Sequence, residues 1–148
     1  MCSITLTKSL WLTSVSSYTD PQNFGILLLP VGECDLKEYL GKSSFTAKEF
    51  RSIRKFFGCI TSGIKYLHDK SCRHKDIKPG NILIKQGVVY ITDFGLAYDW
   101  TDKSKSKTEG LIGDRSVNYM APEIAADQPR GSAADMWSLG CIFLDMLV

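Results

Sequence analysis

The feature that most constrains this chain is an apolar stripe that begins at Phe50 and ends at Leu67. Its members recur at alternating spacings of three and four residues: Phe50, Ile53, Phe57, Ile60, Ile64 and Leu67. Because an α-helix makes one turn in about 3.6 residues, this spacing places all of them on one helical face. Thr46 and Glu49 supply a capping box before the stripe, and Phe45 with Phe50 supplies a hydrophobic staple. The sequence therefore predicts a long helix that packs against a core.

Shorter elements precede this helix. Residues 10–18 and 24–29 are rich in apolar and β-branched side chains, and a turn-forming cluster at 19–23 joins them, which predicts a β-hairpin. Asp35 and Glu38 then form a capping box, which predicts a short helix.

The remaining elements follow the long helix. Short strands are predicted at 82–84 and 88–91, and a polar loop without periodicity at 99–118. A loop of this length inside a compact domain is more often functional than idle. A capping-type box from Ser132 to Asp135 then predicts a final apolar helix.

Composition excludes several classes of partner. Of 148 residues, 44% are hydrophobic and 23% are charged, with a net charge of +2, which is typical of a globular domain. Basic residues do not alternate with aromatic ones, so we expect no nucleic-acid partner. No segment approaches the roughly 18 apolar residues of a membrane span, and we expect neither a membrane partner nor a targeting segment. The five cysteines form no Cys-x-x-Cys pair, so we expect reduced thiols and a cytoplasmic location, with the nucleus as the alternative.

Three polar clusters lie at the ends of predicted elements. They are His-Lys-Asp-Ile-Lys-Pro-Gly-Asn at 74–81, Asp-Phe-Gly at 93–95 and Ala-Pro-Glu at 121–123. Asp76, Asn81 and Asp93 offer the hard oxygen ligands that Mg²⁺ prefers. Lys78 adds a cation close to Asp76, which suits a phosphoryl group that gains negative charge during transfer.

In this order the three clusters resemble the signature motifs of the protein kinase family, across residues 10–148. Tyr66-Leu67-His68 and residues 135–140 resemble the family as well. The resemblance implies an α+β, protein-kinase-like fold: mainly the helical C-terminal lobe, with a hinge hairpin and short catalytic-loop strands, and with the N-terminal lobe largely absent. The expected division is a remnant of the N-terminal lobe at 1–29, the hinge at 30–35 and a partial C-terminal lobe at 36–148.

The resemblance assigns a role to each polar residue. Asp76 is expected to be the catalytic base, acting on the acceptor hydroxyl. Asn81 and Asp93 are expected to bind Mg²⁺. Lys78 and Ser116 match the lysine and the small hydroxyl residue that accompany the base in Ser/Thr-directed kinases, so they favour serine or threonine over tyrosine as the acceptor.

The resemblance also implies an ATP site near the hinge. The residues expected around the nucleotide are Leu28, Leu29, Val31, Asp35, Leu83 and Thr92. Leu28 would guard the back pocket, and backbone groups of Leu29 and Val31 would bond the adenine. Asp35 would hold the ribose, and Leu83 would lie beneath the adenine ring.

The implied function is transfer of the ATP γ-phosphoryl group to a serine or threonine of a protein substrate, with ATP and Mg²⁺ as cofactors. The chain contains no recognisable glycine-rich loop or lysine-bearing strand, so we expect a fragment that is inactive by itself. The alternative is a non-catalytic, kinase-like binding or regulatory fragment. A small-molecule kinase is disfavoured by the segments at 121–123 and 135–140, which are typical of protein-directed members.

Overall fold

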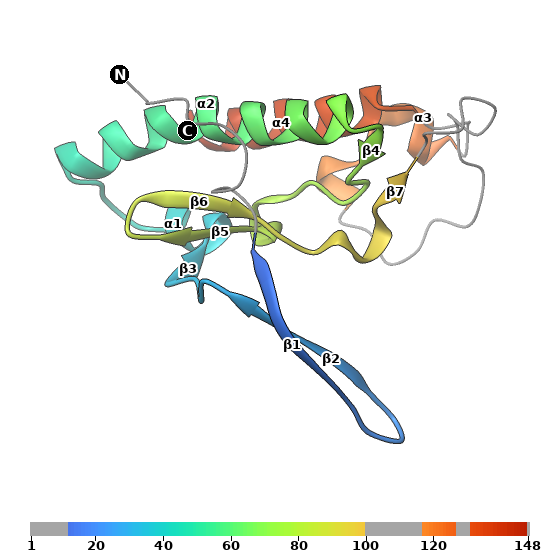
Figure 1. The fold of residues 1–148 in the computed structure, drawn as a ribbon. Helices are drawn as coiled ribbons and strands as arrows, with labels where there is room; N and C mark the ends of the chain where they lie inside the picture. The colour runs from blue at the N-terminus through green and yellow to red at the C-terminus, as the bar shows by residue number, and fades with distance from the viewer. Residues whose placement is uncertain (1–11, 100–116, 127–130, 148) are drawn as a thin grey trace.

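The computed structural model describes residues 12–99, 117–126 and 131–147 (Figure 1). The strands are β1 (Thr13–Thr19), β2 (Phe24–Leu29), β3 (Cys34–Asp35), β4 (Cys72–Arg73), β5 (Ile82–Lys85), β6 (Val88–Ile91) and β7 (Tyr98–Asp99). The α-helices are α1 (Leu36–Leu40), α2 (Ala47–Asp69), α3 (Pro122–Ala125) and α4 (Ala133–Asp145). Short 3₁₀ turns are η1 (Pro79–Asn81), η2 (Phe94–Leu96) and η4 (Val117–Tyr119). Within these ranges no helix is both long and apolar enough to cross a membrane.

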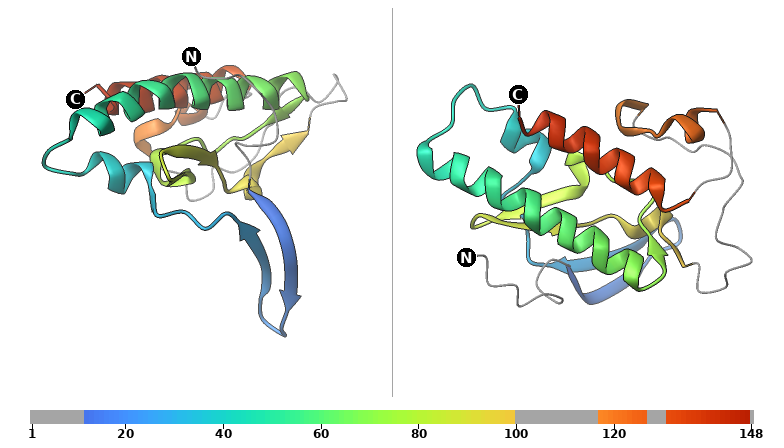
Figure 2. Two further views of the ribbon diagram at one scale, coloured as in Figure 1. Left: turned by 60° about the vertical axis from the view of Figure 1, so that its left-hand side comes forward. Right: turned by 90° about the horizontal axis from the view of Figure 1, so that it is seen from above.

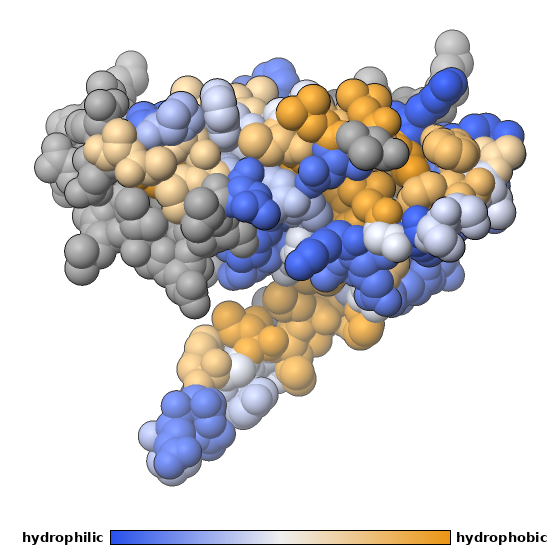
Figure 3. Space-filling model, turned by 180° about the vertical axis from the view of Figure 1, so that it is seen from behind, coloured by the Kyte–Doolittle hydropathy of each residue, from blue (hydrophilic) through white to orange (hydrophobic). Residues whose placement is uncertain are grey.

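Strands β1 and β2 form the predicted hairpin, which extends away from the rest of the molecule (Figure 1). Thr13 lies opposite Leu29, and Thr19 lies opposite Phe24. The Asp20 carboxylate closes the turn, since its Oδ1 accepts the backbone N–H of Gln22 at 2.8 Å and that of the next residue at 2.8 Å. Apolar side chains cover much of the hairpin surface, and the hydrophilic turn lies at its tip (Figure 3).

Helix α2 begins as predicted. The backbone N–H of Thr46 donates to Glu49 Oε2 at 2.8 Å, and the backbone N–H of Glu49 donates to Thr46 Oγ1 at 3.3 Å. The rings of Phe45 and Phe50 lie 5.6 Å apart, which confirms the hydrophobic staple. The apolar stripe itself needs a correction. Phe50 remains exposed and Phe57 is only partly buried, whereas Phe56 is buried in the core.

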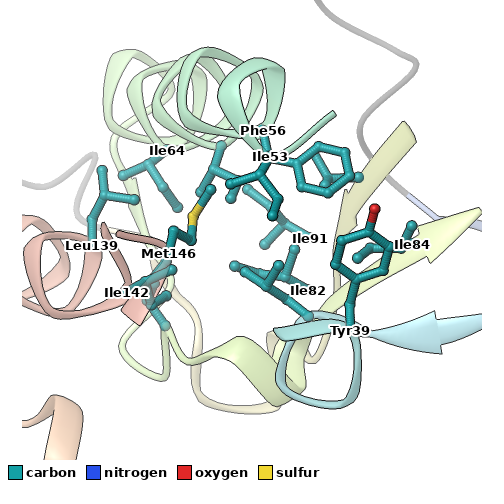
Figure 4. Packing of buried hydrophobic residues seen from close by; sticks show 14 of the residues in the cluster. Tyr39, Ile53, Phe56, Ile64, Ile82, Ile84, Ile91, Leu139, Ile142 and Met146 are labelled. Atoms are coloured by element: carbon teal, nitrogen blue, oxygen red, sulfur yellow. The ribbon is translucent and has the colours of Figure 1, made fainter. Parts of the chain in front are cut away.

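The core lies where α2 packs on α4 and on the β5–β6 hairpin (Figure 4). From α2 the core takes Ile53, Phe56, Ile60, Ile64 and Leu67, and from α4 it takes Leu139 and Ile142. The two helices run side by side when the molecule is seen from above (Figure 2). At the edge of this contact the rings of Phe57 and Phe143 lie 4.6 Å apart. The two predicted helices thus pack together and form one side of the core.

The expected architecture, mainly a helical C-terminal lobe with the N-terminal lobe largely absent, is wrong. Strands accompany the helices over residues 13–99, in three sheets of order β1-β2, β3-β5-β6 and β4-β7. This strand-rich part suggests the N-terminal lobe of the family. The physical reason for the error is that β3, β4 and β7 have two residues each, too few to show the alternation that marks a strand.

Candidate active site

Asp135, in the first turn of α4, holds the loop that carries the candidate catalytic residues. Its carboxylate accepts the backbone N–H of His74 at 2.9 Å and that of Lys75 at 2.9 Å. His68 Nε2 lies 2.9 Å from the same carboxylate. The Asp135 carboxylate therefore joins α4, the end of α2 and this loop. The predicted capping box is wrong, because Ser132 makes no side-chain capping bond and Asp135 faces the loop instead.

The protonation state of Asp135 follows from these contacts. The side chain is only 3% exposed, and burial by itself would raise its pKa. The hydrogen bonds from His68 and from the two backbone N–H groups favour the charged form and more than offset burial, so the pKa of Asp135 lies below its ordinary value. The loop is thus held by a buried, ionised carboxylate.

His74 joins this loop to the segment that carries Asp93. Its Nε2 lies 2.9 Å from the carbonyl oxygen of Thr92, and its ring lies 4.8 Å from the Phe94 ring. The backbone N–H of Asp76 donates to His74 Nδ1 at 3.4 Å, so Nδ1 is the acceptor and Nε2 carries the proton. Burial lowers the pKa of His74 and keeps the imidazole neutral.

Asp76, Lys78 and Asn81 come together as the sequence predicts. Asp76 Oδ2 lies 2.8 Å from Lys78 Nζ and accepts a hydrogen bond from Asn81 Nδ2 at 2.9 Å. Asn81 Nδ2 also donates to the carbonyl oxygen of Asp76 at 2.8 Å. Both amide hydrogens of Asn81 therefore point to Asp76, which leaves the amide oxygen as the atom available to a ligand.

Asp93 follows directly after β6. The backbone N–H of Thr92 donates to the carbonyl oxygen of Asn81 at 3.0 Å, so the ends of the two segments lie together. Asp93 adopts a left-handed backbone conformation with φ 64° and ψ 68°, which ends the extended strand abruptly. Its exposed carboxylate accepts only a local bond from the Gly95 N–H at 3.4 Å within the described ranges. It thus remains accessible to a cation.

The residues expected around the nucleotide are placed less completely. Asp35 and Leu83 are cross-strand partners in β3 and β5, so these two lie together. Asp35 also caps α1 by accepting the Glu38 N–H at 2.7 Å. The side chains of Leu28, Leu29 and Val31 are exposed at the base of the hairpin and just after it. Ser116 lies outside the described residues.

The structure also shows polar contacts that sequence reasoning missed. Ser138 Oγ donates to the carbonyl oxygen of Tyr119 at 2.7 Å, and the Tyr119 hydroxyl donates to Asp145 Oδ2 at 2.6 Å. Burial and this bond raise the pKa of Tyr119 to about 12. Together with Asp76, the segment before Ala121 lines a small hollow of about 20 Å³. Helix α4 is otherwise apolar, and its polar positions 135, 138 and 145 share one helical face. This pattern was the sequence signal that could have indicated these contacts.

The family model of the protein kinase domain matches residues 10–148, strands and helices alike. The chain belongs to the protein kinase family. This kinase chain is 34% identical over 134 residues to the serine/threonine-protein kinase PLK4 of Nematostella vectensis, covering 89% of the chain and 13% of that protein.

Other relatives of the kinase chain match over shorter stretches. It is 34% identical over 99 residues to the serine/threonine-protein kinase nekl-2 of Caenorhabditis elegans, covering 66% of the chain and 27% of that protein. It is 42% identical over 98 residues to the serine/threonine-protein kinase NLK2 of Xenopus laevis, covering 64% of the chain and 21% of that protein. The kinase chain therefore spans about a quarter or less of the length of these curated relatives.

The donor set of the kinase site fits Mg²⁺. Mg²⁺ is usually held by one or two carboxylates together with substrate phosphates rather than by a cage of protein ligands. Within the ranges described, no three His, Cys, Asp or Glu side chains gather as a metal cluster, so such a cage is not what the site offers there. The exposed carboxylate of Asp93 and the amide oxygen of Asn81 are hard oxygen donors of the required kind.

Proposed function

We propose that the protein carrying this chain is a Ser/Thr protein kinase that transfers the γ-phosphoryl group of ATP to a hydroxyl of a protein substrate. The observation that carries the proposal is the contact of Asp76 with both Lys78 and Asn81, which brings the proposed base, a cation and a proposed metal ligand together on one loop. The names of the similar proteins, all serine/threonine-protein kinases, support the choice of acceptor.

Asp76 acts as the base in this proposal. Its Oδ2 is occupied by Lys78 and Asn81, whereas its Oδ1 accepts no hydrogen bond from the residues that the structure describes. Oδ1 can therefore accept the proton of the substrate hydroxyl. The hydroxyl oxygen forms the new bond to the γ-phosphorus as the bond to the bridging oxygen breaks, and ADP leaves with that electron pair. Lys78 offsets negative charge on the phosphoryl group during transfer.

Asn81 and Asp93 would hold Mg²⁺, which when bound neutralises charge on the β- and γ-phosphates. The chain's own contribution is to orient these ligands. Asp76 fixes the Asn81 amide, and the Thr92 N–H ties the start of the Asp93 segment to Asn81. The neutral His74 supports both segments, since it contacts Thr92 and Asp76 together.

The nucleotide is proposed to lie against Asp35 and Leu83. Cross-strand pairing places both on the same sheet, and Asp35 Oδ2 approaches Gly80 of the catalytic loop. The side-chain carboxylate would bond the ribose, and Leu83 would contact the adenine. Backbone groups of Leu29 and Val31 remain the proposed adenine partners. Leu28 and Thr92 are proposed to border the same site, and Ser116 to contact the base.

A non-catalytic binding or regulatory role is the second candidate for the chain by itself. The observation that favours it is that none of the 12 glycines falls into a Gly-x-Gly-x-x-Gly motif, the loop that covers ATP phosphates in protein kinases. Phosphoryl transfer depends almost wholly on positioning and electrostatics, and a misplacement of about 1 Å can cost roughly 10²-fold in rate. We therefore expect no measurable transfer by the isolated chain.

The experiment compares the chain with an extended version, joined to a glycine-rich loop and lysine-bearing strand from a Ser/Thr kinase. Each is incubated with labelled ATP, Mg²⁺ and a mixture of serine, threonine and tyrosine peptides, after circular dichroism has shown that it is folded. We expect label on serine or threonine with the extended chain alone. Label on tyrosine only, or a folded extended chain without activity, contradicts the proposed function. Equal rates for both chains contradict the expected inactivity of the shorter one.

A further inference from the structure

A groove of about 920 Å³ lies away from the catalytic loop. It is enclosed by residues before and within α1, by the first turns of α2 and by the turn between β5 and β6, which gather at the left of the molecule in Figure 1. The turn between β5 and β6 closes one side of the groove, because it lies close to α2. A Cβ placed on Gly87 of this turn would be 3.8 Å from Ser52 Oγ. Its volume falls in the range of about 300–1,000 Å³ that ligand sites occupy, and it is far larger than a single small anion needs.

The groove backs onto the proposed nucleotide site without being part of it. Successive side chains of a strand point to opposite faces of a sheet. Cys34 pairs with Ile84, and both line the groove, whereas Asp35 pairs with Leu83 on the other face. A ligand in the groove would therefore leave the nucleotide face of β3 and β5 open.

Three cations of α2 line the groove without a carboxylate partner among the residues described. Lys48, Arg51 and Lys55 follow one another at three and four residues, which places them on one face of the helix. Lys42 also lines the groove but is paired with Glu49 Oε1 at 2.7 Å. Glu49 Oε2 is engaged by the backbone and hydroxyl of the α2 cap, so Glu49 cannot neutralise the other three.

The charge balance distinguishes this groove from an ordinary solvated face. Its lining holds four cations (Lys42, Lys48, Arg51 and Lys55) and two anions (Glu33 and Glu49), so 4 − 2 gives a net charge of +2. The groove lining therefore carries as much net positive charge as the whole chain, which is +2. The floor is apolar, since Tyr39 and Ile84 are buried side by side there (Figure 4).

We propose that this groove docks an acidic peptide segment of a partner or substrate protein. Carboxylates of the peptide would lie against Lys48, Arg51 and Lys55, and an apolar side chain between them would lie over Tyr39 and Ile84. Charge complementarity selects an anionic occupant, and the apolar floor selects a peptide over a free anion. A single-stranded nucleic acid is disfavoured because its binding uses several aromatic rings for base stacking, and the groove lining described contains one aromatic residue, Tyr39.

The test measures binding of a fluorescent peptide, a run of glutamates around a central pair of leucines, to the full chain by polarisation. The variant Lys48→Gln/Arg51→Gln/Lys55→Gln removes the three cations. The control Arg54→Gln/Lys65→Gln/Lys70→Gln makes the same charge change outside the groove, at two exposed positions of α2 and at its exposed C-cap residue Lys70. We expect the first variant to weaken binding at least about tenfold and the control to leave it within about twofold. A peptide with glutamine in place of glutamate should not bind measurably.

A charge-reversal variant tests the proposal in a second, independent way. The variant Lys48→Glu/Arg51→Glu/Lys55→Glu should reject the acidic peptide and bind a lysine counterpart instead. An equal loss in the groove variant and the control overturns the proposal, because it indicates diffuse charge attraction. Binding of an oligonucleotide in the groove, without binding of the peptide, also overturns it. No nucleotide or transfer is involved, so this outcome is independent of the proposed kinase activity.

Discussion

Asp135 and His74 lie 61 residues apart in the sequence, and the Asp135 carboxylate accepts the His74 backbone N–H at 2.9 Å. Through this bond the start of α4 fixes the start of the loop at 74–81, which carries the candidate catalytic residues. The same carboxylate holds the next residue of the loop and contacts His68 at the end of α2. The loop geometry thus depends on a residue that takes no part in the proposed chemistry.

The variant Asp135→Ala should therefore destabilise the chain strongly. It leaves the buried backbone N–H of His74 and the partly buried N–H of Lys75 without their acceptor, at about 1–3 kcal/mol each. We expect a loss of about 2–6 kcal/mol in the free energy of unfolding, measured with urea. The control Asp145→Ala on the same helix removes one exposed bond and should cost no more than about 1.5 kcal/mol. A smaller loss at Asp135 than at Asp145 would contradict the anchoring role.

The stability of the chain should fall as the pH decreases below the ordinary His pKa of 6.5. Burial lowers the pKa of His74 in the folded chain, so between that lowered value and 6.5 the unfolded chain binds more protons than the folded chain. Stability is therefore highest above this window and decreases through it as the solution is acidified. Urea unfolding at about pH 7.5 and about pH 5.5 measures the effect.

The matched variant for this pH dependence is His74→Gln, which keeps a donor for the Thr92 carbonyl but does not titrate. It should reduce the difference in unfolding free energy between the two pH values. An NMR titration supplies the direct readout, since the His74 ring should reach the midpoint of its titration below pH 6.5. A His74 resonance that titrates above pH 6.5 would show that the imidazole is not buried as described.

Local sequence patterns predicted the helices and strands that are long enough to show a repeating pattern of apolar residues. The stripe in α2 and its capping box were predictable because 23 residues repeat the helical spacing more than six times. Phe56 and Phe57 are both apolar and lie three and four residues after Ile53, so the periodicity by itself allowed either of them to face the core. The two-residue strands carry no pattern, and the fold class was predicted wrongly for that reason.

The candidate site was predictable in part. The order of the polar clusters indicated that Asp76, Lys78 and Asn81 act together, and the structure brings them into contact. The bond between Tyr119 and Asp145 depends on two segments meeting in space, which no local period encodes. The catalytic, metal-binding and nucleotide-binding roles themselves stay predictions.

Loss of the Asp93 carboxylate should weaken binding of the nucleotide in a Mg²⁺-dependent way. In the extended chain, Asp93→Asn removes a charged ligand, and we expect affinity for MgATP to fall at least about tenfold. Affinity for ATP without Mg²⁺ should be unchanged, and so should the stability, because within the described ranges the carboxylate makes only a local bond to Gly95. Titration calorimetry with and without Mg²⁺ measures both affinities. Equal losses under the two conditions would rule out a metal ligand at this position.

The most direct test of the proposed chemistry is the variant Asp76→Asn in the extended chain. Asparagine can keep the bond to the Asn81 amide but cannot accept the substrate proton as a carboxylate does. Initial rates of labelled phosphate transfer to a serine peptide, together with the dissociation constant of MgATP, should separate the two effects. We predict a kcat at least about 10²-fold lower at an unchanged nucleotide affinity. An unchanged kcat, or a loss of activity explained entirely by weaker nucleotide binding, would contradict the assignment of Asp76 as the base.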